Sequence, residues 1–497
     1  MSKKVIIIGS GMSGLSAGCY LQMNGYNTEI FELHNVPGGL CTAWKRNDFT
    51  FDGCIHSIGG LNSKFKLYDH WNELIDIKKL KFFYHDALGT VEDENGKIVT
   101  IFTDPDKLEK ELKSIAPEDT KFINSFIKAI KKLANYDLMP SKPLELWSPL
   151  DYYLSQFKVA PVLYYLIKWS KSVEDVTKKC KSEKLKLALN MDFFSHFPAF
   201  FLLMSLGNLY NKNSGYPIGG SLPFARLLEK KYLELGGKIH YQSKVIKINT
   251  RDNQAMGITL ENGEIHNDAD LIISAADGYC TIFEMLEGKY IDEEIEKLYN
   301  EHPKWPSMVL VSLGIARTFE NDPTSIELHL SKEFIIDEQS KLNSISINIY
   351  NFDPTLAPKG KTCIRVILKT DNYQYWDNLR KNNKGKYVQK KDHIAQEVIK
   401  ILDKRFGNIA NNVEVIDVAT PATFHRYTNN WMGSTQGWTW LPSLIPESIK
   451  KELPGLKNLY LIGQWTTPGG GVSTALQSGR DVTRIICKKD KKQFRVK

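Results

Sequence analysis

Residues 5–14 read VIIIGSGMSG, and this stretch decides the fold of the amino-terminal region. The apolar run Val5–Ile8 is typical of a buried parallel strand, and it stops at glycines spaced as G-x-G-x-x-G. Gly9 permits the tight turn, Gly11 lets the backbone approach a pyrophosphate, and Gly14 allows close packing of helix on strand. A helical pattern follows at once, so its N–H groups point at the phosphates. The stretch predicts a dinucleotide site with these candidate residues: Gly9, Gly11, Met12, Ser13 and Gly14.

A second strand, 28–31, ends at the acid Glu32. A carboxylate eighteen residues past Gly14 is placed to accept hydrogen bonds from ribose hydroxyls, and its charge disfavours a 2′-phosphate. Gly38 and Gly39 follow, and without side chains their backbone can lie against the ligand. We therefore expect an unphosphorylated adenosine ribose in this site.

Composition narrows the class of protein. The chain has 497 residues, enough for two or three domains, and its net charge of +8 is modest for that length. We find no basic cluster interleaved with aromatics and no metal-ligand spacing, so neither a nucleic-acid partner nor a metal is predicted. Seven cysteines without a C-x-x-C pair suit a reducing compartment, and no run of 18 apolar residues occurs. We expect a cytoplasmic protein, with peripheral contact at the inner face of the cell membrane left open.

Further on, the chain resembles a known group of flavoproteins. Glu32 followed by Gly38-Gly39-Leu40-Cys41-Thr42, and the F-x-F-D-x-x-x-H pattern from Phe49 to His56, are similar to the flavin amine oxidase-like superfamily. Within it, the pattern resembles the branch of phytoene desaturases, carotenoid isomerases and retinol saturases. The resemblance implies FAD as the dinucleotide, with Gly39 and Leu40 near its ribityl and pyrophosphate portions. It also implies that residues 52–60 lie near the isoalloxazine.

Two later segments carry the same resemblance. The block 216–277 contains a helix pattern, strands and the string Ser274–Asp277. In the family that it resembles, the corresponding block belongs to the FAD domain. The strand 458–463 runs into GQWTTPGGGV, which is close to the family motif G-x-x-T-x-P-G-G-G-V, with Gln464 where many relatives carry an acid. The resemblance adds these residues to the expected FAD contacts: Val245 at the adenine, Ala275, Gly463 at the pyrophosphate, and Gly470, Gly471 and Val472 at the isoalloxazine.

The resemblance implies an α/β fold of the glutathione reductase type, a Rossmann-like FAD-binding domain with a mixed-sheet substrate domain and a helical cap. We predict strands at 308–315, 343–350 and 362–369, a helix at 391–405 and an exposed polar loop at 371–388. The aromatic-rich middle favours a lipophilic tunnel or a membrane-facing mouth. The predicted parts are the discontinuous FAD-binding domain at 1–60, 216–277 and 420–497, the cap or membrane-facing region at 61–215, and the substrate domain at 278–419.

Acid–base candidates are few. His56 lies in the segment expected near the isoalloxazine, and His425 with Arg426 could orient a polar end group or contact the flavin edge. These three are the weak catalytic candidates. His196 lies within the aromatic run 193–210, where a buried imidazole usually satisfies a core contact. The chemistry is therefore expected to come from the cofactor.

The leading hypothesis is an FAD-dependent oxidoreductase that acts on carbon–carbon bonds of a lipophilic polyene or isoprenoid-like substrate by hydride transfer at flavin N5. Desaturation, saturation and isomerisation stay open. An amine oxidase or protoporphyrinogen oxidase type is the alternative, disfavoured because Leu40 stands where those enzymes typically have Arg. A non-catalytic FAD-containing lipid carrier is the third. With one dinucleotide fingerprint, NAD(P)(H) is at most a transient electron partner, beside oxygen or a quinone. No oligomeric state is predicted.

Overall fold

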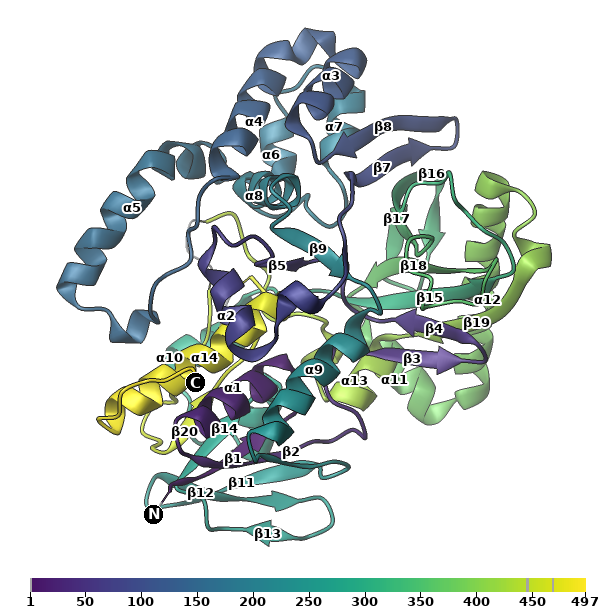
Figure 1. Cartoon of the computed structure of the whole chain (residues 1–497). Helices are drawn as coiled ribbons and strands as arrows, with labels where there is room; N and C mark the ends of the chain where they lie inside the picture. The colour runs from purple at the N-terminus through teal and green to yellow at the C-terminus, as the bar shows by residue number, and fades with distance from the viewer. Residues whose placement is uncertain (1, 444–446, 467–468) are drawn as a thin grey trace.

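A computed structural model describes residues 2–443, 447–466 and 469–497. The amino-terminal strand belongs to a parallel five-stranded sheet with the order β10-β2-β1-β14-β20, which lies in the lower part of Figure 1. Each strand is short, and the mostly apolar β1 pairs with β2 on one side and with β14 on the other. The strands of this parallel sheet are β1 (Lys4–Ile8), β2 (Asn27–Phe31), β10 (Lys238–His240), β14 (Leu271–Ser274) and β20 (Leu459–Leu461).

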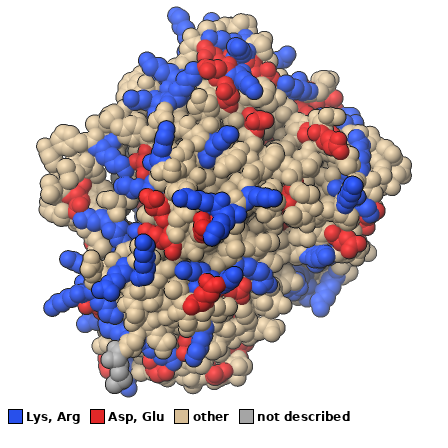
Figure 2. Space-filling view, in the orientation of Figure 1, with Lys and Arg blue, Asp and Glu red and all other residues tan. Residues whose placement is uncertain are grey.

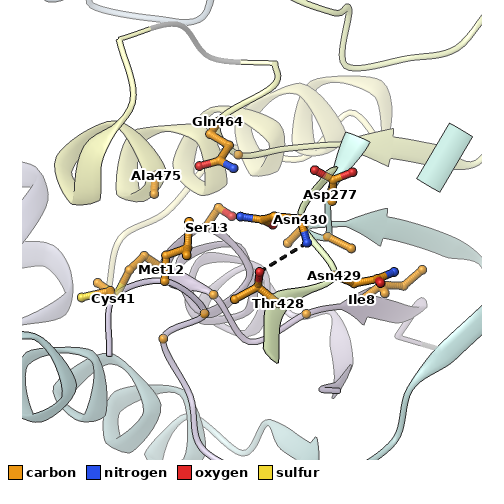
Figure 3. Close-up of a pocket in the computed structure, with 18 of the residues that line it drawn as sticks. Ile8, Met12, Ser13, Cys41, Asp277, Thr428, Asn429, Asn430, Gln464 and Ala475 are labelled. Carbon is orange, nitrogen blue, oxygen red and sulfur yellow. Dashed lines mark hydrogen bonds between the residues drawn. The ribbon is translucent and has the colours of Figure 1, made fainter. Parts of the chain in front are cut away.

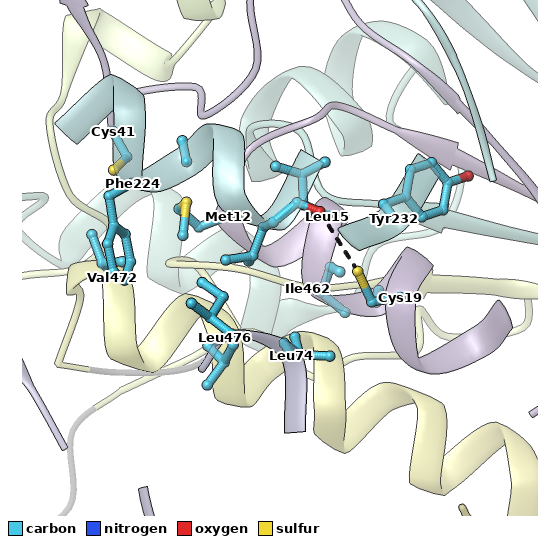
Figure 4. Close-up of a cluster of buried hydrophobic side chains, with 14 of the residues drawn as sticks. Met12, Leu15, Cys19, Cys41, Leu74, Phe224, Tyr232, Ile462, Val472 and Leu476 are labelled. Atoms are coloured by element: carbon cyan, nitrogen blue, oxygen red, sulfur yellow. Dashed lines mark hydrogen bonds between the residues drawn. The ribbon is translucent and has the colours of Figure 1, made fainter. Parts of the chain in front are cut away.

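The parallel sheet is buried on both faces, because successive side chains of a strand point to opposite sides. Val5 and Ile7 face three packed helices, whereas Ile6 and Ile8 face an antiparallel meander. Figure 4 shows the helix side, where Leu15, Tyr232 and Leu476 meet in one apolar cluster. The helices are α1 (Met12–Met23), α9 (Ser221–Glu234) and α14 (Gly471–Lys489); the meander is β11 (Val245–Arg251), β12 (Gln254–Leu260) and β13 (Ile265–His266), with α10 (Glu293–Glu301) packed beside it.

The second part of the fold is a mixed seven-stranded sheet. Its order is β19-β15-β18-β17-β16-β7-β8, antiparallel except where β16 runs parallel to β7. Helices α11 (Tyr373–Asn382) and α12 (Lys384–Phe406) bury their apolar residues against this sheet. The strands are β7 (Ala87–Asp93), β8 (Gly96–Phe102), β15 (Ser307–Ile315), β16 (Ser325–Ile335), β17 (Lys341–Ile349), β18 (Thr362–Thr370) and β19 (Val413–Ala419).

The predicted strands and helix of this region agree with β15, β17, β18 and α12 to within a few residues, except that α12 begins seven residues earlier. The prediction of an exposed loop at 371–388 was wrong. Helix α11 lies there, and its Trp376 is fully buried and donates its indole N–H to Asp337 at 3.2 Å. The polar composition of the stretch hides an amphipathic helix that covers the sheet.

The third part is a helical cap, drawn at the top of Figure 1. Its core joins Phe126, Trp169 and Phe200, so part of the aromatics of the middle region pack against one another. Among the described residues, no helix has the length and apolar character needed to cross a bilayer. The cap helices are α3 (Pro105–Ile115), α4 (Thr120–Leu133), α5 (Pro149–Lys168), α6 (Val173–Thr177), α7 (Glu183–Leu189) and α8 (Ala199–Tyr210).

The remaining elements connect these parts. Strand β9 pairs with both β5 and β6, and helix α2 packs against α14. Strands β7 and β8 lie within residues 61–215 of the predicted cap, yet they extend the mixed sheet. The division into three parts stays a prediction. The connecting elements are β3 (Ala43–Arg46), β4 (Phe49–Asp52), β5 (Ile58–Gly59), α2 (Lys66–Leu74), β6 (Phe82–Phe83) and α13 (Pro421–Thr428) with β9 (Ser214–Pro217).

Candidate cofactor and substrate site

A cavity opens at the carboxyl ends of β1, β2 and β14 (Figure 3). The chain runs from β1 to β2 on one side of β1, and β14 is added later on the other side, so the strand order changes direction at this point. A ligand usually binds at such a point in an open parallel sheet. The structure brings together nearly all of the predicted cofactor residues in this one cavity. Those that line it are Gly9, Gly11, Met12, Ser13, Glu32, Gly38, Gly39, Leu40, Val245, Ala275, Gly463, Gly470, Gly471 and Val472.

The glycines of the first turn have different surroundings. A Cβ at Gly14 would lie 2.0 Å from the carbonyl oxygen of Gly9, so this glycine serves the packing of α1 on β1 and does not line the cavity. Gly9 has a φ of +95° and donates its N–H to the carbonyl of Phe31 at 2.8 Å. A Cβ at Gly11 would meet nothing within 4 Å. The protein leaves that space open where a pyrophosphate would approach.

Glu32 is buried at the end of β2 and lines the cavity. Its Oε2 accepts from the backbone N–H of Ser10 at 2.6 Å and from the Ser10 hydroxyl at 2.8 Å, and its Oε1 accepts from the N–H of His34 at 2.8 Å. The carboxylate therefore shapes the glycine turn, and Oε1, which accepts only one hydrogen bond, keeps capacity for a ribose hydroxyl.

The carboxyl-terminal motif forms the other end of the cavity. Gly470 and Gly471 have φ of +58° and +83°, and α14 starts at Gly471 with its N-terminus at the cavity wall. Gly463 has a φ of +100° and donates its N–H to the Ser478 hydroxyl at 2.9 Å. Thr467 and Pro468 of the motif lie outside the described residues. The positive end of the α14 dipole favours electron-rich oxygens here.

These features fit a flavin dinucleotide along its length. An acid and an open glycine lie at one end, and a helix N-terminus beside Cys54 lies at the other. The N-terminus of α1, at Met12, supplies backbone N–H groups, and the open space beside Gly11 supplies the room that a pyrophosphate needs.

Sequence reasoning gave no role to several residues that line the cavity. Asp277 is buried and accepts from the N–H of Trp431 at 3.0 Å and from that of Cys280 at 2.9 Å; burial raises its pKa to about 6. Its position just beyond β14, at a carboxyl end, was the available signal. The other unassigned lining residues include Cys54, Lys244, Thr428, Asn429, Asn430, Thr435, Gln464 and Trp465.

A second cavity of ≈ 80 Å³ lies between the cap and the mixed sheet. Cys54 lines the first cavity and His56 the second, so the segment 54–57 is the wall between them. The side chains of His56 and Ser57 are accessible, and their exposed surface lines the second cavity. The remaining lining residues come from four regions of the chain: His85, Ala87, Leu88, Leu209, Tyr216, Thr324, Ser325, Asn348, Tyr350 and Phe352.

A buried polar network joins the two sheets beneath this wall. Asp52 accepts from the backbone N–H and hydroxyl of Ser221, at 2.5 and 2.7 Å, and thereby caps the start of α9. Arg365, on β18, donates to the backbone carbonyl of Asp52 at 2.6 Å and also contacts the ring of His56. Burial raises the pKa of Asp52 in spite of the nearby guanidinium. His56 is surrounded by protein although its ring faces the second cavity, and this desolvation together with Arg365 holds the pKa of His56 well below its usual range.

The other histidine candidates lie elsewhere. His425, on α13, has its Nδ1 3.0 Å from the carbonyl of Asn430, and Arg426 is exposed and contacts Tyr427. Neither lines either cavity, so of the three weak catalytic candidates the structure brings only His56 to a cavity. His196 was expected in the core, but its side chain is 77% exposed beside Glu174, because it lies in the turn that precedes α8.

Comparison with known proteins identifies the family of the chain. Residues 12–487 match the family described as Flavin containing amine oxidoreductase, and the chain belongs to that family. Prolycopene isomerase 1 of an Oncidium hybrid cultivar is 27% identical (95% of this chain, 82% of that protein). Phytoene desaturase (neurosporene-forming) of Rhodobacter capsulatus is 24% identical (97% and 94%), and all-trans-retinol 13,14-reductase of Danio rerio is 24% identical (92% and 82%). Within the family, the chain groups with the carotenoid desaturase and isomerase branch.

The fold is shared with solved flavoproteins. An oxidoreductase from Methanosarcina mazei superposes with a TM-score of 0.60 at 19% identity, covering 97% of this chain and 100% of that one. The α/β FAD-binding fold expected from the sequence is thereby confirmed, and the family implies FAD as the cofactor. A nicotinamide electron partner finds no support in the family or the relatives and stays a prediction.

Proposed function

We propose that this protein is an FAD-dependent oxidoreductase that acts on carbon–carbon bonds of a lipophilic polyene or isoprenoid-like substrate. One observation carries the proposal: relatives that match at least nine-tenths of the chain bear the names of prolycopene isomerase, phytoene desaturase and retinol 13,14-reductase. FAD, when bound, supplies the acceptor or donor for the hydride. Leu40 at the cavity, in place of the arginine typical of amine oxidases, supports the same reading.

The described side chains support a site in which the protein orients and shields the substrate rather than exchanging protons with it. The ring nitrogen of His56 that contacts Arg365 has to be an acceptor, because a guanidinium only donates. That lone pair is then not free to take a proton from substrate. The wall segment 54–57 lies between the cofactor cavity and the second cavity, with Cys54 lining one and His56 the other.

The test compares polyenes with amines on the FAD-loaded protein. Under anaerobic conditions, prolycopene, phytoene and retinol are each mixed with the oxidised and the reduced protein while the flavin absorbance is recorded. We expect bleaching or recovery of the flavin band with at least one polyene, and a product altered at a carbon–carbon bond by mass spectrometry. Putrescine is the matched amine. Turnover of the amine alone contradicts the proposal, and binding of polyenes without any product identifies a carrier.

We also propose that the substrate is taken from a membrane surface that α5 contacts. This helix projects from the cap with its first residues almost wholly exposed (Figure 1), and Tyr152 and Phe157 expose 64% and 61% of their surface. Lys158 and Lys168 lie on the same helix, and Figure 2 shows a mostly uncharged projection with basic residues beside it. Aromatic and leucine side chains beside lysines are typical of helices that lie in the interface of an anionic bilayer.

The membrane contact is tested by sedimentation with vesicles of phosphatidylglycerol and phosphatidylcholine. The double variant Tyr152→Ser with Phe157→Ser should lose most of its binding, whereas its flavin content stays unchanged. Ile265→Ser is the matched control, because Ile265 is 59% exposed but lies on the meander. Equal sedimentation of wild type and both variants contradicts the contact. We propose a cytoplasmic protein that meets the inner face of the cell membrane in this way.

A further inference from the structure

Two of the seven cysteines lie together in the wall of the cofactor cavity. Cys41 follows the turn 38–40, Cys54 begins the segment 54–57, and both residues line the cavity. Figure 3 shows Cys41 beside Met12 in this wall. Both thiols are free. The expected contacts with FAD come mainly from glycine turns and a carboxylate, so the thiol pair has no role in them.

The hairpin of β3 and β4 places the two cysteines opposite each other. The last pair of its ladder is Ala43 with Asp52. A backbone hydrogen bond of 2.9 Å between the next residue of each strand extends the register, so Cys41 and Cys54 form the pair after it. Pairs of an antiparallel ladder alternate in type, and this one is of the non-hydrogen-bonded type, with Cα atoms about 4.5 Å apart. That separation lies within the range of about 4.4–6.8 Å in which a disulfide forms.

The two thiols differ in their surroundings. Cys41 is buried and donates its S–H to the carbonyl of Ser221 at 3.5 Å. The neighbouring thiol of Cys54, together with burial, raises the pKa of the Cys41 thiol well above its ordinary value, so Cys41 stays protonated. Cys54 keeps part of its surface accessible. A small oxidant that enters the cavity therefore meets Cys54 first, and Cys41 is the thiol behind it.

We infer that Cys41 and Cys54 are a redox-active dithiol, which hydrogen peroxide converts to a disulfide in the wall of the cofactor cavity. The sulfur of Cys54 attacks one peroxide oxygen, so an S–O bond forms, the O–O bond breaks and the first water leaves. The sulfur of Cys41 then displaces the remaining oxygen as a second water and forms the S–S bond. The peroxide takes up two electrons and the two thiol protons, and two molecules of glutathione reverse the reaction. The bond joins the turn 38–40 to the segment 54–57 and thereby cross-links two parts of the cavity wall.

The experiment treats the FAD-loaded full chain with hydrogen peroxide, alkylates the remaining thiols in urea and maps the tryptic peptides without reduction. Trypsin cuts after Lys45 and Arg46, so the two cysteines fall on separate peptides, 5–45 and 47–64. We expect these peptides to be linked, with two of the seven thiols lost and no linked dimer on a non-reducing gel. Fragment spectra distinguish Cys41 from Cys19, which shares its peptide. Glutathione should restore both thiols.

Two variants complete the test. Cys54→Ser should give no linked peptides and keep its remaining thiols under the same treatment. Cys363→Ser is the matched control, because Cys363 is also buried beside this hairpin, with its sulfur 3.5 Å from the carbonyl of Thr50, but lies outside the cavity. It should form the linked peptides as wild type does. Oxidation of Cys54 to a sulfinic acid with Cys41 left free, or an equal loss of thiols in Cys54→Ser, overturns the inference and leaves the proposed function in place.

Discussion

At the scale of single residues, Gly11 and Gly14 look alike in the sequence and differ in what surrounds them. Gly14 is pressed against the carbonyl of Gly9, whereas the space beside Gly11 is free of protein atoms. Gly11 also has an ordinary φ of −61°, which any residue adopts. The structure therefore separates a glycine needed for folding from one needed for the ligand.

Gly11→Val should leave the fold intact and abolish FAD retention, because its side chain fills the space left for the pyrophosphate. Gly14→Ala should instead fail to fold normally, because its Cβ would lie 2.0 Å from a backbone oxygen. Circular dichroism reports folding and the ratio of flavin to protein absorbance reports loading. A folded Gly11→Val protein saturated with FAD would refute the assignment of this turn.

Asp277 predicts a specific dependence of stability on pH. Its folded pKa of about 6 lies above its ordinary value of 3.8, so the unfolded chain releases the proton first. This carboxyl stabilises the fold fully below pH 3.8, and the contribution is lost as the pH rises through 6. The loss amounts to about 3 kcal/mol by the conversion of 1.36 kcal/mol per pKa unit.

The measurement compares wild type with Asp277→Asn in urea unfolding between pH 4 and pH 7. The difference in free energy of unfolding, wild type minus variant, should fall steadily over that range and level off near neutrality. A difference that is flat with pH would show that Asp277 titrates normally in the folded protein.

At the scale of elements, the cap is held by close contacts between helices. A Cβ at Gly207 on α8 would lie 2.7 Å from the Cα of Ala134, which follows α4. Because the neighbour is backbone, it cannot give way by turning a side chain. Gly207 therefore sets the separation of α4 and α8, around which the aromatic core of the cap packs.

Gly207→Ala should lower the free energy of unfolding by about 1–3 kcal/mol, because overpacking outweighs the helix propensity that alanine gains. Gly385→Ala on α12 is the matched control: the nearest atom to its Cβ is 3.8 Å away, so it should be neutral or up to about 1 kcal/mol more stable. Thermal unfolding of both variants decides between the two effects. Equal melting temperatures would contradict the role of Gly207.

The elements also show what a sequence can predict. Much of the parallel sheet was predictable because β1 and β20 are short apolar runs that end in glycine turns, and all but one of the predicted cofactor residues line the cavity. Strand β16 and helix α11 were missed because they are half polar. Their apolar sides are recognised only once β16 is paired within the mixed sheet and α11 is packed against it. Arg365 was missed because its role depends on β18 lying against the segment 52–57.

At the scale of the whole molecule, the two sheets are coupled. Asp52 belongs to the amino-terminal segment and Arg365 to the mixed sheet. The two residues are joined in a buried network, where Arg365 donates a hydrogen bond to the backbone carbonyl of Asp52. A ligand that binds the folded chain alone therefore stabilises both parts together. The gain is ~4 kcal/mol when free FAD is a thousandfold above its dissociation constant.

Heating the FAD-loaded protein should thus release flavin and unfold the mixed sheet in one transition. Flavin fluorescence follows release, and far-ultraviolet circular dichroism follows secondary structure. The midpoint of both should rise with added FAD. Release of flavin well below the temperature at which the secondary structure melts would show that the two sheets unfold separately.

The place of β20 in the parallel sheet bears on how the protein is made. Strand β14 pairs with β1 on one edge, but its other neighbour, β20, begins only at Leu459. At ~5–20 residues per second, roughly 10–40 seconds of translation separate the end of β14 at Ser274 from the start of β20 at Leu459. Throughout that time the outer edge of β14 is open to wrong pairing, and the turn before α14 has yet to close the cavity. Expression at lower temperature or with chaperones, and flavin supplied after synthesis, should therefore raise the yield of loaded protein.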